Sequence, residues 1–144
     1  MTMANDTNTP LDGLTVLIIE DEFLIGMLLV NEIELAGAAS VGPFNTVAGA
    51  LKEIESGVAD IAIVDSKLAD GSAADLADAL ENRGMQFVVV SGYEKENLPQ
   101  ALKGAPFLTK PLSMPLLIET IQLLTSHAVV ASAPDKASAP GPLS

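Results

Sequence analysis

The chain has 144 residues, of which 49% are hydrophobic, and a formal net charge of -12. This length fits one domain with a single core, and with only seven Lys and Arg residues the chain is not expected to bind nucleic acid directly. The absence of cysteine and the presence of a single histidine, His127, exclude disulfides, thiol catalysis and zinc sites built from cysteine or histidine. Carboxylate oxygens remain as metal ligands, and they suit Mg²⁺ or Ca²⁺.

Both ends of the chain are expected to lie outside the core. Residues 1–12 lack the basic and apolar regions of a signal peptide and are interpreted as a flexible segment. Residues 128–144 are rich in Ala, Pro and Ser and predict a disordered tail. The longest strongly apolar stretch, residues 23–30, is too short to span a membrane. We therefore expect one domain over residues 13–127 of a cytoplasmic protein.

Segments typical of strands and of helices alternate between these ends. Residues 14–19 predict a buried strand, and residues 22–35 predict a long helix closed by Gly37. A weaker strand ends at Gly42-Pro43, and Asn45 is a candidate N-cap for a helix that runs to residue 55. Further strands are expected over residues 61–64, 87–90 and 105–108.

The helices of the second half begin at polar residues. Ser72 opens a capping box for a helix that runs to Asn82, and Ser113 caps a last helix. Between the fourth and fifth strands we expect only a short or irregular helix that starts near Asn97, because Pro99 cannot occupy the middle of a helix.

Five strand and helix units therefore follow one another, and the strands are apolar on both faces. Such strands belong to a parallel sheet that helices cover on both sides. The predicted fold is α/β with three layers, a doubly wound (βα)5 arrangement whose five-stranded parallel sheet has the strand order 2-1-3-4-5.

Polar residues follow four of these strands directly. Glu20, Asp21 and Glu22 come after the first strand, Asp65 after the third, Ser91 after the fourth and Lys110 after the fifth. Doubly wound sheets bind their ligands at the carboxyl ends of the strands, so these side chains are expected to converge. Each residue alone would be an ordinary strand end, turn or helix start, but their joint placement favours a functional site.

This set of residues fits phosphoryl transfer. Neighbouring carboxylates repel one another unless a divalent cation and a lysine offset their charge, and Mg²⁺ suits an oxygen site. A carboxylate beside Mg²⁺, an ammonium and a hydroxyl can accept a phosphoryl group, because these groups neutralise the phosphoryl oxygens. Asp65 is then the nucleophile and forms an acyl phosphate.

The segments VLIIEDE, VDSKLADGS, VVVSGY and FLTKPL resemble those of response-regulator receiver domains of two-component signalling, over residues 14–126. The resemblance implies a flavodoxin-like or CheY-like fold with Asp65 as the phosphoacceptor. It also implies a Mg²⁺ site in which Asp21 binds the metal directly, Glu20 binds it through water and Lys67 offers its backbone carbonyl.

The same resemblance assigns roles to residues of the later strands. Ser91 resembles the switch hydroxyl that moves toward the phosphoryl group, and Lys110 resembles the lysine that pairs with it. The Lys110-Pro111 bond resembles one that is commonly cis in this family. Phe107 occupies the position of the switch aromatic residue, although plain core packing explains it equally well.

The segment QFVVVSGYEKENLPQALKGAPFLTKP is similar to the FAT-GUY subgroup of receivers, with Ser91 in place of the subgroup's Thr and without its Phe-Ala pair. The subgroup implies a single-domain protein in alphaproteobacterial general-stress signalling, with kinases of the HWE or a related type. Lys67 and Tyr93 lie at positions that influence phosphoryl loss in the family, and we expect a long-lived phosphorylated form.

The expected function is that of a monomeric single-domain response regulator. A histidine kinase or phosphotransfer protein would phosphorylate it, and it would signal by protein contact or act as a phosphate sink, without being an enzyme for another substrate. The alternative is a pseudo-receiver that binds partners without phosphorylation. A haloacid-dehalogenase-type phosphatase needs an acid where Lys67 stands, and a flavodoxin-like cofactor site would be repelled by residues 20–22.

Overall fold

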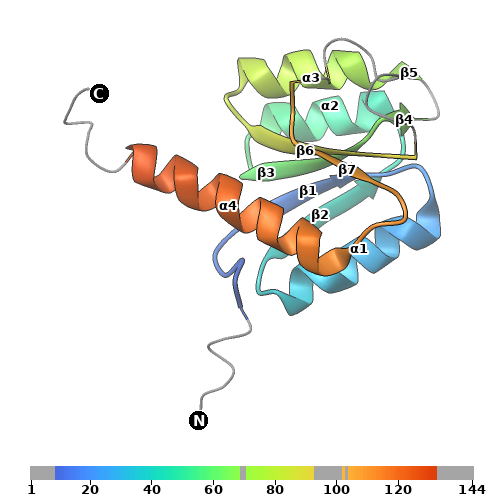
Figure 1. Ribbon diagram of the computed structural model, residues 1–144. Coiled ribbons are helices and arrows are strands. Elements are labelled where there is room, and N and C mark those ends of the chain that lie inside the picture. The colour runs from blue at the N-terminus through green and yellow to red at the C-terminus, as the bar shows by residue number, and fades with distance from the viewer. Residues whose placement is uncertain (1–8, 69–70, 93–101, 103, 133–144) are drawn as a thin grey trace.

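The computed structural model describes residues 9–68, 71–92, 102 and 104–132. Its centre is a five-stranded parallel sheet with the strand order β2-β1-β3-β6-β7 (Figure 1). The strands are β1 (Thr15–Ile19), β2 (Ala39–Phe44), β3 (Ile61–Asp65), β6 (Gln86–Ser91) and β7 (Phe107–Thr109). This order confirms the predicted doubly wound α/β fold.

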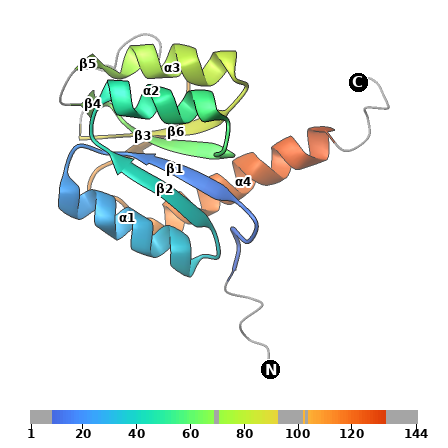
Figure 2. The same cartoon turned by 180° about the vertical axis from the view of Figure 1, so that it is seen from behind.

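Helices cover both faces of the sheet, as Figures 1 and 2 show from opposite sides. They are α1 (Phe23–Leu35), α2 (Val47–Ser56), α3 (Ala73–Asn82) and α4 (Met114–Ser132). Leu17 and Ile19 of β1 lie in a core cluster with residues of α2 and α3, whereas Val16 and Ile18 lie in a second cluster with residues of α1 and α4. Successive side chains of a strand point to opposite faces, so one apolar strand supplies both cores.

The boundaries of α2 show how local chemistry positions the helices. The Gly49 N–H donates to the Oγ1 of Thr46 at 3.1 Å, so Thr46 caps the helix, and the predicted cap at Asn45 was wrong by one residue. Gly57 ends the helix with a φ of 73°, a left-handed conformation that suits glycine. The Arg83 side chain also donates to the carbonyl oxygens of Ile54 and Glu55 in the last turn, and the Gly57 N–H donates to the same Ile54 carbonyl at 3.1 Å.

Three features differ in detail from the sequence-based expectations. Leu11, predicted to lie in a flexible segment, is fully buried in the core, and its N–H donates to the Ala36 carbonyl at 2.9 Å. The last helix continues to Ser132, because the first proline after Ser113 that can end it comes only at residue 134, outside the described part. A strand pair that was not predicted, β4 (Lys67–Leu68) with β5 (Gly71–Ser72), precedes α3, which itself begins directly after Ser72 and ends at Asn82 as predicted.

The short fourth helix expected near Asn97 falls on residues outside the described part of the chain. Within the described residues, no helix combines the length and the apolarity that a membrane crossing requires.

Candidate functional site

The carboxyl ends of four strands meet at one edge of the sheet. Asp65 is the last residue of β3 and pairs in register with Val90, and Ser91 is the last residue of β6 and pairs with Thr109 of β7. The Lys110 N–H donates to the Ser91 carbonyl at 2.9 Å, so the ladder between these strands extends to the lysine. Glu20 follows β1 at the same edge. The sheet therefore brings the residues predicted from the strand ends together.

Three carboxylates form a compact cluster at this edge. Glu20, Asp21 and Asp65 each offer an oxygen, and these oxygens lie within 4.8 Å of one another. Glu20 and Asp65 are only 2% and 3% exposed. Buried carboxylates are costly unless opposite charge or hydrogen bonds compensate them, so the cluster calls for cations.

Lys110 supplies part of that compensation. Its Nζ lies 3.2 Å from Oε2 of Glu20, 3.5 Å from Oδ2 of Asp65 and 3.3 Å from Oε1 of Glu22. Asp21 adds a fourth carboxylate to the three that Lys110 contacts. When all five groups are ionised, one ammonium faces four carboxylates, and three negative charges remain uncompensated.

The pKa values respond to this surplus of negative charge. Burial, followed by the hydrogen bond with Glu20, raises the pKa of Asp65. Burial, followed by the hydrogen bond with and the repulsion by Asp65, raises the pKa of Asp21. For Lys110, burial alone would lower the pKa, but attraction to Asp65 and contacts with Glu20 raise it overall. Asp65 and Asp21 are therefore harder to ionise, and the Lys110 ammonium harder to neutralise, than in water.

The donor set fits a divalent metal ion. Glu20, Asp21 and Asp65 converge as oxygen donors of the kind that Mg²⁺ prefers, and a 2+ charge would offset most of the remaining negative charge. The Lys67 N–H donates to Oδ1 of Asp65 at 3.1 Å and thereby orients the carboxylate. That the Lys67 carbonyl also binds the metal stays a prediction.

Asp65 opens into a pocket of about 370 Å³. The pocket is lined by Asp21, Glu22, Asp65, Ser66, Lys67, Ser91, Gly92 and Lys110. Ser91 is fully buried, and its Oγ lies 2.6 Å from the Oγ of Ser66, which donates a hydrogen bond to it. The volume of the pocket is large enough for a small oxyanion next to the Asp65 carboxylate.

Two residues that line this pocket with polar side chains, Ser66 and Glu22, were not predicted as site residues. Ser66 follows Asp65 directly, so its position at a strand end was a usable signal, but its contact with Ser91 depends on side-chain orientation. Glu22 was recognised only as one of three acids after the first strand, and its ion pair with Lys110 joins residues 88 positions apart. Tyr93, expected to influence phosphoryl loss, lies outside the described residues.

Phe107 lies apart from the residues that line this pocket. It is partly buried in β7 and packs against the core cluster that contains residues of α2 and α3. This position agrees with core packing and leaves the role of a switch aromatic residue as a prediction. The Lys110-Pro111 bond, which follows the same strand, is cis.

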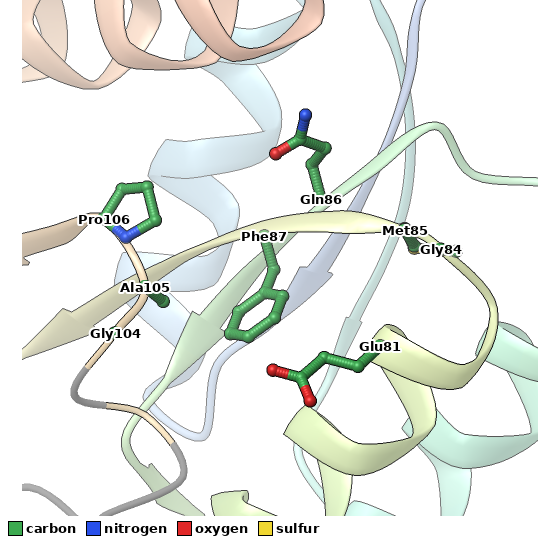
Figure 3. Close-up of a pocket in the computed structure, with 8 residues that line it drawn as sticks. All are labelled: Glu81, Gly84, Met85, Gln86, Phe87, Gly104, Ala105 and Pro106. Atoms are coloured by element: carbon green, nitrogen blue, oxygen red, sulfur yellow. The ribbon is translucent and has the colours of Figure 1, made fainter. Parts of the chain in front are cut away.

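A second pocket, of about 490 Å³, lies at the amino end of β6, and Figure 3 shows its residues. Phe87 and Gln86 point to opposite sides of the strand in this view. Among the described residues that line it, Glu81 alone carries an ionisable side chain. This pocket therefore lacks the convergent acids and cation that would support phosphoryl chemistry.

Comparison with known proteins identifies the family. The model of the response regulator receiver domain family matches residues 16–122. SdrG from Sphingomonas melonis Fr1, known from its solution structure, is 34% identical, with 77% of this chain and 96% of that chain covered and a TM-score of 0.67.

Two further solved structures share the fold. The signal receiver domain of a modulated diguanylate cyclase from Desulfovibrio desulfuricans G20 is 22% identical, with 83% of this chain and 98% of that chain covered and a TM-score of 0.75. A CheY-like response regulator receiver domain from Methylobacillus flagellatus is 24% identical, with coverages of 77% and 98% and a TM-score of 0.67. No curated protein matches the chain. The family match over most of the chain, together with the acidic edge of its sheet, leads to one conclusion: the chain belongs to the response regulator receiver domain family.

Proposed function

We propose that this receiver domain accepts a phosphoryl group on Asp65, with Mg²⁺ bound, from a histidine kinase or a histidine phosphotransfer protein. One observation carries the proposal. The buried Asp65 carboxylate lies between two further carboxylates and the Lys110 ammonium, with Oδ2 at 3.5 Å from Nζ. A carboxylate placed in this way can act as a nucleophile whose product is stabilised by neighbouring positive charge.

The transfer would exchange one bond for another. A carboxylate oxygen of Asp65 attacks the phosphorus of the phosphohistidine, a P–O bond forms and the P–N bond breaks, and its electron pair returns to the imidazole nitrogen. Lys110 binds a phosphoryl oxygen, and the Lys67 N–H holds the Asp65 carboxylate in its orientation. Mg²⁺ held by Glu20, Asp21 and Asp65 would supply positive charge beside the phosphoryl oxygens.

The surface next to the acidic site suits a protein as the phosphodonor. Phe23 and Leu24 open α1 and are 70% and 76% exposed, and Met27 and Leu28 lie exposed one turn later. Exposed apolar side chains that cluster in this way are typical of protein interfaces. Because α1 begins only two residues after Asp21, a donor protein that packs on this face could bring its histidine to Asp65.

Within the family, we propose that the chain acts as a single-domain regulator of the FAT-GUY subgroup rather than as an enzyme for another substrate. The Ser91-Gly92-Tyr93 sequence supports this, and the shortened fourth helix that the subgroup implies falls on residues outside the described part. The output would be a protein contact or the removal of phosphate from a relay. A pseudo-receiver is less favoured, since nothing in a phosphorylation-independent module requires Asp65, Ser91 and Lys110 to meet.

Incubation with Mg²⁺ and acetyl phosphate, followed by intact mass measurement, tests the phosphoacceptor. The wild type should gain the mass of one phosphoryl group and Asp65→Asn should gain none. Asp78→Asn, which changes an exposed aspartate of α3 in the same way, is the matched control and should behave as the wild type. A wild type that gains no mass with acetyl phosphate or with a phosphorylated histidine protein would overturn the proposal in favour of the pseudo-receiver.

A further inference from the structure

Ser66 joins the phosphoacceptor to the switch hydroxyl. It follows Asp65 directly, and its N–H donates to the Val90 carbonyl at 3.0 Å, so the ladder between β3 and β6 continues through it. The adjacent residue on β6 is Ser91, and the two hydroxyl oxygens lie 2.6 Å apart. Ser66 is half-buried and Ser91 fully buried, which shields this hydrogen bond from competing water.

This hydrogen bond constrains the group that the phosphoryl chemistry needs. A serine hydroxyl has one proton to donate, and its oxygen can rotate only by changing the χ1 rotamer. Whichever hydroxyl donates, the contact fixes the Ser91 rotamer relative to Ser66. If the Ser91 oxygen turned toward a phosphoryl group on Asp65, the hydrogen bond from Ser66 would break, or the Ser66 hydroxyl would have to change its rotamer to follow.

We propose that Ser66 is a positioning residue that holds the Ser91 hydroxyl in a resting orientation and thereby weakens binding of the phosphoryl group. The inference rests on the proposed function, because it concerns the same site. Ser66 acts through Ser91, and both residues line the pocket beside Asp65. The contribution of one net hydrogen bond predicts a shift of about two- to tenfold in phosphoryl affinity.

Beryllofluoride, which mimics a phosphoryl group on an aspartate, provides the probe. Its Kd is measured in the presence of Mg²⁺, by calorimetry or NMR titration, for the wild type, Ser66→Ala, Ser91→Ala and the double variant. Ser66→Ala should bind about two- to tenfold more tightly than the wild type, because the hydrogen bond from Ser66 no longer opposes the turn of the Ser91 hydroxyl toward the phosphoryl group. Ser91→Ala should bind more weakly, and adding Ser66→Ala to it should change nothing further, because Ser66 has lost the group through which it acts.

Three further variants keep the inference falsifiable. Ser66→Thr retains the hydroxyl and should restore the wild-type Kd, whereas Ser66→Cys, a weak hydrogen-bond donor of similar shape, should shift the Kd in the direction of Ser66→Ala. The cysteine variant also serves if Ser66→Ala does not fold. Ser40→Ala removes a hydroxyl that donates to Oε2 of Glu34 at 2.8 Å, away from the pocket, and should leave the Kd unchanged.

The outcomes separate this inference from the proposed function. A wild type that binds no beryllofluoride would overturn the proposed function and, with it, this inference. Normal wild-type binding together with weaker or unchanged binding by Ser66→Ala would overturn the inference alone. Additive effects of Ser66→Ala and Ser91→Ala would also overturn it, since they would show that Ser66 acts independently of Ser91.

Discussion

The two ends of β6 hold pockets of opposite character. The pocket at the amino end is larger, about 490 Å³ against about 370 Å³, yet its described lining has one carboxylate, Glu81, among glycine, apolar and amide residues. The described lining of the smaller pocket at the carboxyl end has three acids, Asp65 among them, and two lysines. The proposed function therefore rests on the convergence of ionisable groups and not on the size of the cavity.

The topology of the sheet explains the difference. At the carboxyl ends of the parallel strands, β1, β3, β6 and β7 all lead into polar residues, and the strand order places these residues around one crevice. At the amino end, β6 begins directly after the turn at Gly84 and Met85, so short and apolar side chains line the pocket. Substitutions at the two ends should consequently affect different properties of the protein.

The largest effect on stability is expected at the amino end. Phe87 is 8% exposed and lies in the core cluster with α2 and α3 while also lining the larger pocket. Phe87→Ala should lower the free energy of unfolding by about 3 kcal/mol, because it leaves a cavity in the core. Urea unfolding measures this, and phosphorylation of the folded fraction should remain. If Phe87→Ala kept the free energy of unfolding of the wild type, packing of the Phe87 ring at this end of β6 would not stabilise the fold.

The largest effect on chemistry is expected at the carboxyl end. Lys110→Gln removes the ammonium that faces Glu20 and Asp65, and it should slow phosphorylation by acetyl phosphate about 100-fold. Lys52→Gln, an exposed lysine on α2, is the control. Glu81→Gln in the larger pocket should also leave the rate unchanged. A rate loss with Glu81→Gln would contradict the contrast between the two pockets.

The acidic edge should also make stability depend on pH in metal-free protein. The pKa of Asp65 is raised above its ordinary value of 3.8 by burial and by Glu20, so the folded state holds the proton more tightly than the unfolded chain. Ionisation of Asp65 therefore costs more free energy in the folded protein than in the unfolded chain and lowers the free energy of unfolding. This loss of stability is absent below pH 3.8 and develops as the pH rises through the folded-state pKa of Asp65. In EDTA, Asp65→Asn should therefore become increasingly more stable than the wild type over this range.

Urea unfolding at a series of pH values checks this expectation. Addition of Mg²⁺ near pH 7 should stabilise the wild type more than Asp65→Asn, because the metal offsets the carboxylate charge that the variant has partly lost. If the difference in the free energy of unfolding between the wild type and Asp65→Asn stayed the same from acid to neutral pH, the raised pKa of Asp65 would be contradicted.

The smallest effect is expected at the exposed rim of the same pocket. Glu22 pairs with Lys110 at 3.3 Å, but its side chain is 61% exposed, and such pairs contribute little free energy. Glu22→Gln should leave Lys110 freer to bind a phosphoryl oxygen and should raise the phosphorylation rate about twofold. The acetyl phosphate reaction followed over time measures this, and a large loss of rate would instead make Glu22 part of the phosphoryl site.

Much of the fold and of the site could be predicted from local pattern. Short apolar runs that alternate with helical segments required a parallel sheet, and polar residues after those runs had to meet at its carboxyl edge. This reasoning placed Glu20, Asp21, Asp65, Ser91 and Lys110 in one site. These five residues could be found because each lies directly after a predicted strand or at its end, and the amino-acid sequence shows which residues those are.

Contacts between side chains were beyond the same reasoning. The hydrogen bond from Ser66 to Ser91 and the ion pair of Glu22 with Lys110 depend on rotamers and on distances across the sheet. Leu11 entered the core because the end of α1 offered it the Ala36 carbonyl and an apolar cluster. The amino-acid sequence by itself thus determined the alternation of strands and helices and the polar residues at the strand ends, since these follow from hydrophobic periodicity. The strand order was predicted from the doubly wound fold type that this alternation indicates. Only the tertiary structure decided which hydroxyl holds Ser91 and which acids share Lys110, because a few ångströms of packing separate a contact from its absence.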